Sequence, residues 1–140
     1  MSGIFSTPPP PGAGRVSDNL FDFTDFLPTI ADITNTSIPA EYGQIDGHSI
    51  YSILNGSNDD TRDWIFNHYF IDTDYNRIPS RWVQNRQYKL YEDNKGFFHA
   101  PGFYNVQNDI MEINPLMDNQ LTPAELSTRQ SFQQVLDSLK

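Results

Sequence analysis

Residues 81–91 read RWVQNRQYKLY, and this stretch decides the fold class. Apolar and aromatic residues occur among polar ones on both sides of the dipeptide Asn85-Arg86, a pattern typical of two short strands joined by a tight turn. The stretch therefore predicts a β-hairpin.

More strands flank this hairpin. From Asp63 onward the pattern has a period of two, which predicts a strand over about 64–70, followed by a loop at 71–80. A turn at 93–96 leads to a further short strand at 97–99. The region between about 63 and 106 is thus expected to hold three or four short antiparallel strands.

Two segments have helical spacing. The first is a helix over about 24–34, with Thr24 as its N-cap and Pro28 in its first turn. Its apolar stripe, at three- and four-residue intervals, consists of Leu20, Phe23, Phe26, Leu27, Ile30 and Ile33.

The second helix covers about 123–139. Thr122 is its expected N-cap, Pro123 takes the first helical position, and Glu125 completes a capping box. The side chains expected to face the core are Leu126, Phe132, Val135, Leu136 and Leu139.

These elements predict an α+β fold, a small antiparallel sheet of three to four strands with a C-terminal helix and one N-terminal helix packed on it. Residues 1–16 are a Pro/Gly-rich lead-in, and residues 17–140 form the lobe itself. The length of 140 residues suits one domain.

Composition excludes several classes of function. The chain has no cysteine, which excludes disulfides, thiolate metal sites and cysteine nucleophiles. The net charge of −9 disfavours nucleic acid and anionic membranes as partners. No apolar run reaches the length of a membrane span, and the first residues do not read as a signal peptide.

Positive charge is concentrated in one place. Four of the nine basic residues fall within thirteen positions: Arg77, Arg81, Arg86 and Lys89. They form either an anion-attracting patch on an acidic protein or scattered surface charge.

Five segments occur in a particular order. They are Asp25, Pro28 and Thr29 within 15–34; Asp46-Gly47-His48-Ser49-Ile50; residues 62–69; the hairpin 81–91; and Tyr104 to Asn114. Together they resemble the C-terminal region of the sulfatase family, which belongs to the alkaline-phosphatase-like superfamily. The departures from the family pattern are Asn105, Val106 and Ile110.

The resemblance implies sulfate-ester hydrolysis by a formylglycine nucleophile, made from a Cys/Ser-x-Pro-x-Arg motif, with calcium polarising the sulfate oxygens. This chain lacks that motif: Ser6-Thr7-Pro8-Pro9-Pro10 has no arginine, and Ser37 to Glu41 ends on an acid. We therefore expect no catalytic and no metal-binding residue here. Calcium and formylglycine are expected in a missing N-terminal part, and the chain alone is expected to be inactive.

The resemblance also places the hairpin region near the mouth of the sulfate pocket. The candidate substrate-binding residues are His68, Tyr69, Arg77, Arg81 and Trp82. Each could instead have a structural role.

The expected partners are the N-terminal sulfatase catalytic domain and, in the parent enzyme, a sulfated small molecule or glycan. The family is commonly periplasmic, secreted or lysosomal, which leaves the location of this chain open. One alternative is a free-standing, non-catalytic interaction module derived from such a lobe. Another is a self-sufficient hydrolase that uses His48 and Ser49, or the Asp59-Asp60 pair.

Overall fold

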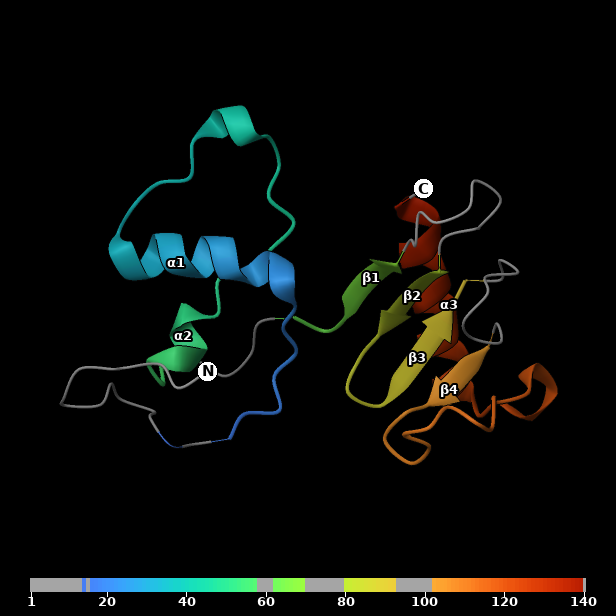
Figure 1. Cartoon of the computed structure of the whole chain (residues 1–140). Coiled ribbons are helices and arrows are strands. Elements are labelled where there is room, and N and C mark those ends of the chain that lie inside the picture. Colours follow the sequence, from blue (N-terminus) through green and yellow to red (C-terminus); the bar gives the residue numbers. More distant parts are fainter. Residues whose placement is uncertain (1–13, 15, 58–61, 70–79, 93–101, 140) are drawn as a thin grey trace. The chain divides into compact units, whose positions relative to one another are not determined.

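The computed structural model describes residues 14, 16–57, 62–69, 80–92 and 102–139 (Figure 1). The chain forms two compact units, residues 1–63 and residues 64–140, a division that the sequence analysis does not anticipate. The first unit contains short helices, and the second contains a sheet and the C-terminal helix.

The second unit is built on a four-stranded antiparallel sheet in the order β1-β2-β3-β4. The strands are β1 (Ile65–Tyr69), β2 (Ser80–Gln84), β3 (Tyr88–Tyr91) and β4 (Phe103–Asn105). Strands β2 and β3 form the predicted hairpin, with Val83 opposite Leu90. In its turn, Oδ1 of Asn85 accepts hydrogen bonds from the backbone N–H groups of Gln87 and Tyr88 at 2.9 and 2.7 Å.

Helix α3 (Pro123–Ser138) packs on one face of this sheet, as predicted. Its start also agrees with the prediction, because Thr122 and Glu125 form a capping box. The buried core consists of Val83, Leu90, Phe103, Phe132 and Leu136. The α+β class is thereby confirmed.

Two residues predicted to face this core are exposed instead. Leu126 is 42% exposed and Leu139 is 46% exposed. Leu126 precedes Phe132 by six positions, which turns it about 120° around the helix from the core-facing line. Leu139 lies past the last helical residue.

The first unit contains η1 (Phe23–Asp25), α1 (Phe26–Thr34), η2 (Ala40–Tyr42) and α2 (Tyr51–Leu54). The helix predicted over 24–34 is present, but its N-cap was wrongly assigned to Thr24. Asp22 is the cap, and its carboxylate accepts from the backbone N–H of Thr24 at 2.8 Å. A 3-10 turn before α1 moves the start of the helical segment back by two residues.

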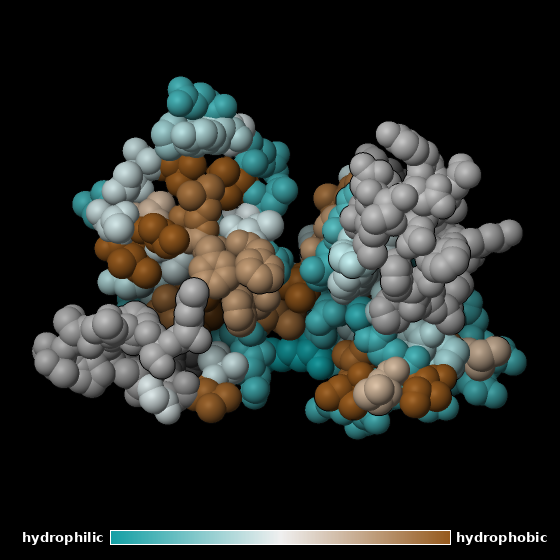
Figure 2. All heavy atoms as spheres, viewed as in Figure 1, coloured by the Kyte–Doolittle hydropathy of each residue, from teal (hydrophilic) through white to brown (hydrophobic). Residues whose placement is uncertain are grey.

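The helical segment formed by η1 and α1 has an inverted distribution of polarity. Asp25 and Thr29, four positions apart, are 1% and 4% exposed. The apolar side chains of this segment are at least half exposed, and Figure 2 shows brown and tan side chains gathered on this unit. They are Phe23, Phe26, Leu27, Ile30 and Ile33.

Some predictions remain open. The N-terminal helix lies in the first unit, so its packing on the sheet stays a prediction. The strand predicted at 97–99 and nearly all of the loop at 71–80 lie outside the described residues. Among the helices that the structure describes, none combines the length and the hydropathy needed to cross a bilayer.

Candidate functional site

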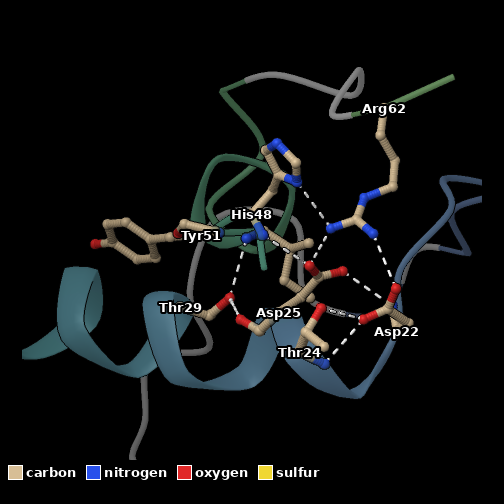
Figure 3. A network of polar contacts seen from close by, with 9 residues as sticks. Asp22, Thr24, Asp25, Thr29, His48, Tyr51 and Arg62 are labelled. Carbon is tan, nitrogen blue, oxygen red and sulfur yellow. Dashed lines mark hydrogen bonds and ion pairs between the residues drawn. The ribbon is translucent and has the colours of Figure 1, made fainter. Parts of the chain in front are cut away.

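Asp25 lies at the centre of a buried polar network in the first unit (Figure 3). Its carboxylate accepts from the backbone N–H groups of Asp22 at 2.9 Å and His48 at 2.8 Å, and it forms an ion pair with Arg62. The other amino group of Arg62 donates to Oδ2 of Asp22 at 2.9 Å. The Arg62 side chain is only 10% exposed, so both charges of the central pair are buried and each has a partner.

The same helix face holds the loop of residues 46–50. The hydroxyl of Thr29 donates to the carbonyl oxygen of Asp25 at 2.6 Å and accepts from the backbone N–H of Ile50 at 3.0 Å. Gly47 approaches the helix so closely that a Cβ atom there would lie 1.9 Å from the carbonyl oxygen of Thr24. Two of the five sequence segments, one around Asp25 and one around Gly47, are thus parts of one interlocked structure.

His48 faces Arg62, with 3.0 Å between its Nδ1 atom and the guanidinium. Because arginine has no acceptor, Nδ1 must accept, which assigns the ring hydrogen to Nε2. Ser49 accepts from the backbone N–H of Tyr51 at 3.2 Å. Among the hydrogen bonds of the described residues, none joins Ser49 to His48, so this geometry offers no nucleophile–base pair for the hydrolase alternative.

A second polar cluster lies in the unit of residues 64–140. Glu112 accepts from Nζ of Lys89 at 2.8 Å and from the hydroxyl of Tyr91 at 2.6 Å. Nζ of Lys89 lies 4.9 Å from the ring centroid of Trp82 and 4.6 Å from that of Tyr91, within cation–π range. The lysine therefore has both an ionic and an aromatic environment.

The backbone of Glu112 adopts an unusual conformation to make these contacts. Its φ angle is +54°, in the left-handed region that non-glycine residues seldom adopt. Asp109 shapes the turn, because its carboxylate accepts from the backbone N–H groups of Ile113 at 3.1 Å and Asn114 at 2.7 Å. The segment that follows β4, up to Asn114, thus turns back so that Glu112 contacts the sheet.

Two tyrosines of this cluster have perturbed acidity. Burial, then the hydrogen bond to Glu112 and the charge of that carboxylate, raise the pKa of Tyr91 far above its usual value. Burial, with the charges of Glu112 and Asp109, also raises the pKa of Tyr104. Both phenols therefore stay neutral at physiological pH.

Arg81 makes internal contacts with several elements. One amino group donates to both carboxylate oxygens of Glu92, at 3.0 and 3.2 Å. The other donates to the carbonyl oxygens of Leu136 and Leu139, at 3.0 and 3.1 Å. The guanidinium carbon also lies 5.3 Å from the ring centroid of Phe66. Arg81 therefore caps the C-terminal end of α3, where a cation is favourable.

The structure divides the predicted substrate-binding residues between the two faces of the sheet. His68 and Arg81 are direct cross-strand partners on the face that carries Phe66 and α3. Tyr69 and Trp82 lie on the opposite face, because successive side chains of a strand alternate. Arg77 lies outside the described residues. A role in substrate binding stays a prediction for all five.

The basic cluster is similarly dispersed. Arg81 pairs with Glu92, and Lys89 pairs with Glu112. Arg86 is exposed beside Asn85 in the hairpin turn. The described members therefore do not converge on one ligand.

The described part of the chain contains no group of three or more His, Asp or Glu side chains arranged to hold a metal ion. Asp59 and Asp60 lie outside the described residues. The roles of Gly47 and Glu112 were not predicted from the sequence, although both residues lie within the family-like motifs. Predicting Gly47 would have required knowledge that two backbone segments approach closely there. Predicting Glu112 would have required knowledge that its φ angle is positive.

Comparisons with known proteins agree with this architecture. A family model described as "N-sulphoglucosamine sulphohydrolase, C-terminal" matches residues 5–139. A search of curated proteins gives no match.

Three solved structures share the fold. A 2-O GAG sulfatase aligns at 21% identity and a TM-score of 0.61 over 82% of this chain and 23% of its own. A protein of Bacteroides thetaiotaomicron described as a sulfatase aligns at 21% identity and a TM-score of 0.60, over 81% of this chain and 23% of its own. A protein solved in complex with its substrate D-glucosamine-2-N,6-O-disulfate aligns at 21% identity and a TM-score of 0.58, over 82% and 23%. The chain therefore spans about a quarter of the length of these proteins.

Proposed function

This chain belongs to the family of N-sulphoglucosamine sulphohydrolase C-terminal regions, and from that premise we propose that it completes the substrate pocket of a sulfuric ester hydrolase. The observation that carries the proposal is the family match over residues 5–139, together with an aligned length of only 23% of each solved sulfatase. The remaining length is where the catalytic residues of such an enzyme would lie.

The proposed division of chemistry follows from the residues present. The sequence has no Cys/Ser-x-Pro-x-Arg motif to form a formylglycine nucleophile. Its described residues gather no set of carboxylates suited to calcium, which prefers six to eight oxygen ligands. We assign the nucleophile and the calcium site to the remainder of the parent enzyme, where calcium would polarise the sulfate oxygens.

The contribution of this chain is binding. Tyr69 is exposed and Trp82 is half-buried on the sheet face opposite α3, and aromatic rings of this kind suit stacking on a sugar. His68 is exposed on the other face. We propose Tyr69 and Trp82 as the contacts to a sulfated sugar, with His68 and Arg77 as further candidates. Arg81 is the weakest of the five because its guanidinium is occupied by Glu92 and α3.

The experiment is to read and express the whole reading frame that contains this sequence. We expect a Cys/Ser-x-Pro-x-Arg motif upstream, and calcium-dependent release of sulfate from a sulfated hexosamine when the protein is made with a formylglycine-generating enzyme. Trp82→Ala should then raise KM for the sugar sulfate more than it lowers kcat. A reading frame without the motif, or a full-length protein inactive on a panel of sulfated sugars, would overturn the proposal.

The free-standing interaction module is disfavoured by one observation. A module that functions alone would have polar residues wherever the parent enzyme once covered it. The exposed side of η1 and α1 is apolar instead, with Phe23 at 90% exposure and Ile30 at 56%.

A further inference from the structure

Trp82 is in contact with two neighbours on the sheet face opposite α3. Tyr91 is its direct cross-strand partner, with 5.7 Å between the two ring centroids. Lys89 precedes Tyr91 by two residues on the same face, and its Nζ atom lies 4.9 Å from the centroid of the indole ring. A cation at this distance is attracted to the ring, so the lysine restricts the orientation of Trp82.

Lys89 is in turn fixed by Glu112. Its Nζ donates to one carboxylate oxygen at 2.8 Å, while the other oxygen accepts from the hydroxyl of Tyr91 at 2.6 Å. The side chains of Lys89 and Glu112 are only 12% and 17% exposed. An ammonium that is paired and largely buried has little freedom to move. Since Glu112 also balances its charge, Lys89 is poorly suited to bind a sulfate group directly.

The indole of Trp82 is nevertheless open to a ligand, because the residue is only half-buried. Among the hydrogen bonds of the described residues, none involves its N–H group. That group is not one of their buried unsatisfied atoms either, so it reaches the surface. Indole offers this single donor, which a sugar hydroxyl can accept, and an apolar ring against which the C–H groups of a pyranose can pack.

We infer that Lys89 is a positioning residue for Trp82, an inference that rests on the proposed function. Glu112 holds the ammonium, the ammonium orients the indole, and the indole presents its donor and its open surface to the sugar. Because the charges of Lys89 and Glu112 balance, this contact recognises the sugar ring and not the charge of its sulfate groups.

The test is a double-mutant cycle in the full-length enzyme, made from the whole reading frame together with a formylglycine-generating enzyme. KM and kcat are measured on a sulfated hexosamine. The first change is Lys89→Met with Glu112→Gln, which removes both charges at once and keeps side chains of similar length. The second change is Trp82→Ala. The matched control neutralises another ion pair of the same unit, by Arg129→Met with Asp118→Asn.

We expect the double variant of Lys89 and Glu112 to raise KM about tenfold, with kcat and the thermal midpoint close to those of the control. In the Trp82→Ala background it should raise KM no further, because Lys89 acts through the indole. A purely structural role would add the same factor in both backgrounds, and that result would overturn the inference.

The remaining outcomes separate this inference from the proposed function. If Trp82→Ala raises KM while the double variant leaves KM unchanged, the positioning role is wrong and the proposed function stands. If Trp82→Ala leaves KM unchanged, Trp82 is not a sugar contact, and both that part of the proposed function and the inference fall. If the double variant unfolds, Glu112→Gln alone replaces it, since this change keeps an acceptor for Tyr91 and releases only the ammonium. KM should then rise severalfold, and an unchanged KM would overturn the inference.

Discussion

Tyr91 donates its phenolic hydrogen to Glu112 at 2.6 Å, and Glu112 holds a left-handed backbone conformation with a φ angle of +54°. A non-glycine residue held at positive φ costs roughly 1 kcal/mol or more, so the contacts of its side chain must offset that cost. Tyr91 and Lys89 supply those contacts, because each donates a hydrogen bond to the Glu112 carboxylate.

This relationship predicts a loss of stability at alkaline pH. The pKa of Tyr91 is raised in the folded state above its usual value of 10.0 by burial and by Glu112, so the unfolded chain loses the proton first. The stabilisation is fully present below pH 10 and declines as the pH rises beyond it. Tyr91→Phe should flatten the fall in unfolding free energy between about pH 10 and 12, measured by urea denaturation. Tyr42→Phe, at an exposed position, serves as the control; an unchanged slope in Tyr91→Phe would contradict the assignment.

Gly47→Ala should destabilise the first unit. The new Cβ atom would lie 1.9 Å from the carbonyl oxygen of Thr24, so backbone must move to admit it. We expect a loss of about 3 kcal/mol in unfolding free energy, at the upper end of overpacking effects. Gly43→Ala is the graded control: its Cβ meets nothing within 4 Å, but its φ of +78° with ψ of −156° lies in a region essentially confined to glycine, which costs about 1–3 kcal/mol. Equal losses in the two variants would argue against the close approach.

Arg81→Ala should lower the stability of the folded chain. The change removes a two-pronged pair with Glu92 and leaves two carbonyl oxygens at the end of α3 without their donor. We expect a loss of about 3 kcal/mol in chemical denaturation, against less than about 1 kcal/mol for Arg86→Ala in the exposed turn. In the full-length parent, a tenfold or greater rise in KM with stability unchanged would instead favour the substrate-binding role of Arg81.

Asp25→Asn should be strongly destabilising despite its nearly identical shape. Arg62 would remain buried with only Asp22 to neutralise it, and breaking a buried pair typically costs 3–5 kcal/mol, so we expect about 3 kcal/mol. The measurement is the thermal midpoint followed by circular dichroism, with Asp18→Asn on the exposed approach to the helix as control. A fall no larger than that of the control would show that the ion pair contributes little.

The isolated chain should not hydrolyse any aryl sulfate, with or without calcium and a formylglycine-generating enzyme. The sequence lacks the motif on which that enzyme acts, and neither addition supplies it. The assay is release of the aryl alcohol above a buffer blank. Activity that survives repurification would contradict the proposed division of chemistry.

The local sequence pattern was sufficient to predict much of the fold. The turn at Asn85 and the cap at Thr122 were predictable because side chains bond to backbone within three positions. The start of α1 was misplaced by two residues because Asp22 and Thr24 are both good caps, and a pattern alone does not rank them. The division near residue 63 depends on long-range packing, which no local pattern reports.

The candidate site was harder to predict. His68 and Trp82 lie on different strands, so alternation along each strand does not by itself tell whether they share a face. That requires the register between β1 and β2, which depends on the packing of the folded sheet. Arg81 was a reasonable candidate for an anion, but its partners Leu136 and Leu139 are 55 and 58 positions away. Contacts at such separation leave no trace in a single sequence.

The ion pair of Asp25 and Arg62 also constrains the order in which the chain can fold as it is made. Arg62 follows Asp25 by 37 positions, and closing a loop of that length costs about 3 kcal/mol of chain entropy. Synthesis runs from the N-terminus, so Asp25 joins the chain 37 positions before the guanidinium that neutralises its buried carboxylate. Until then the Asp25 carboxylate stays hydrated, and the ion pair that fixes the orientation of the helix is not formed. A chain truncated before residue 62 would thus hold the Asp25 carboxylate without its ion-pair partner, and the orientation of α1 should become fixed only in chains that extend past Arg62.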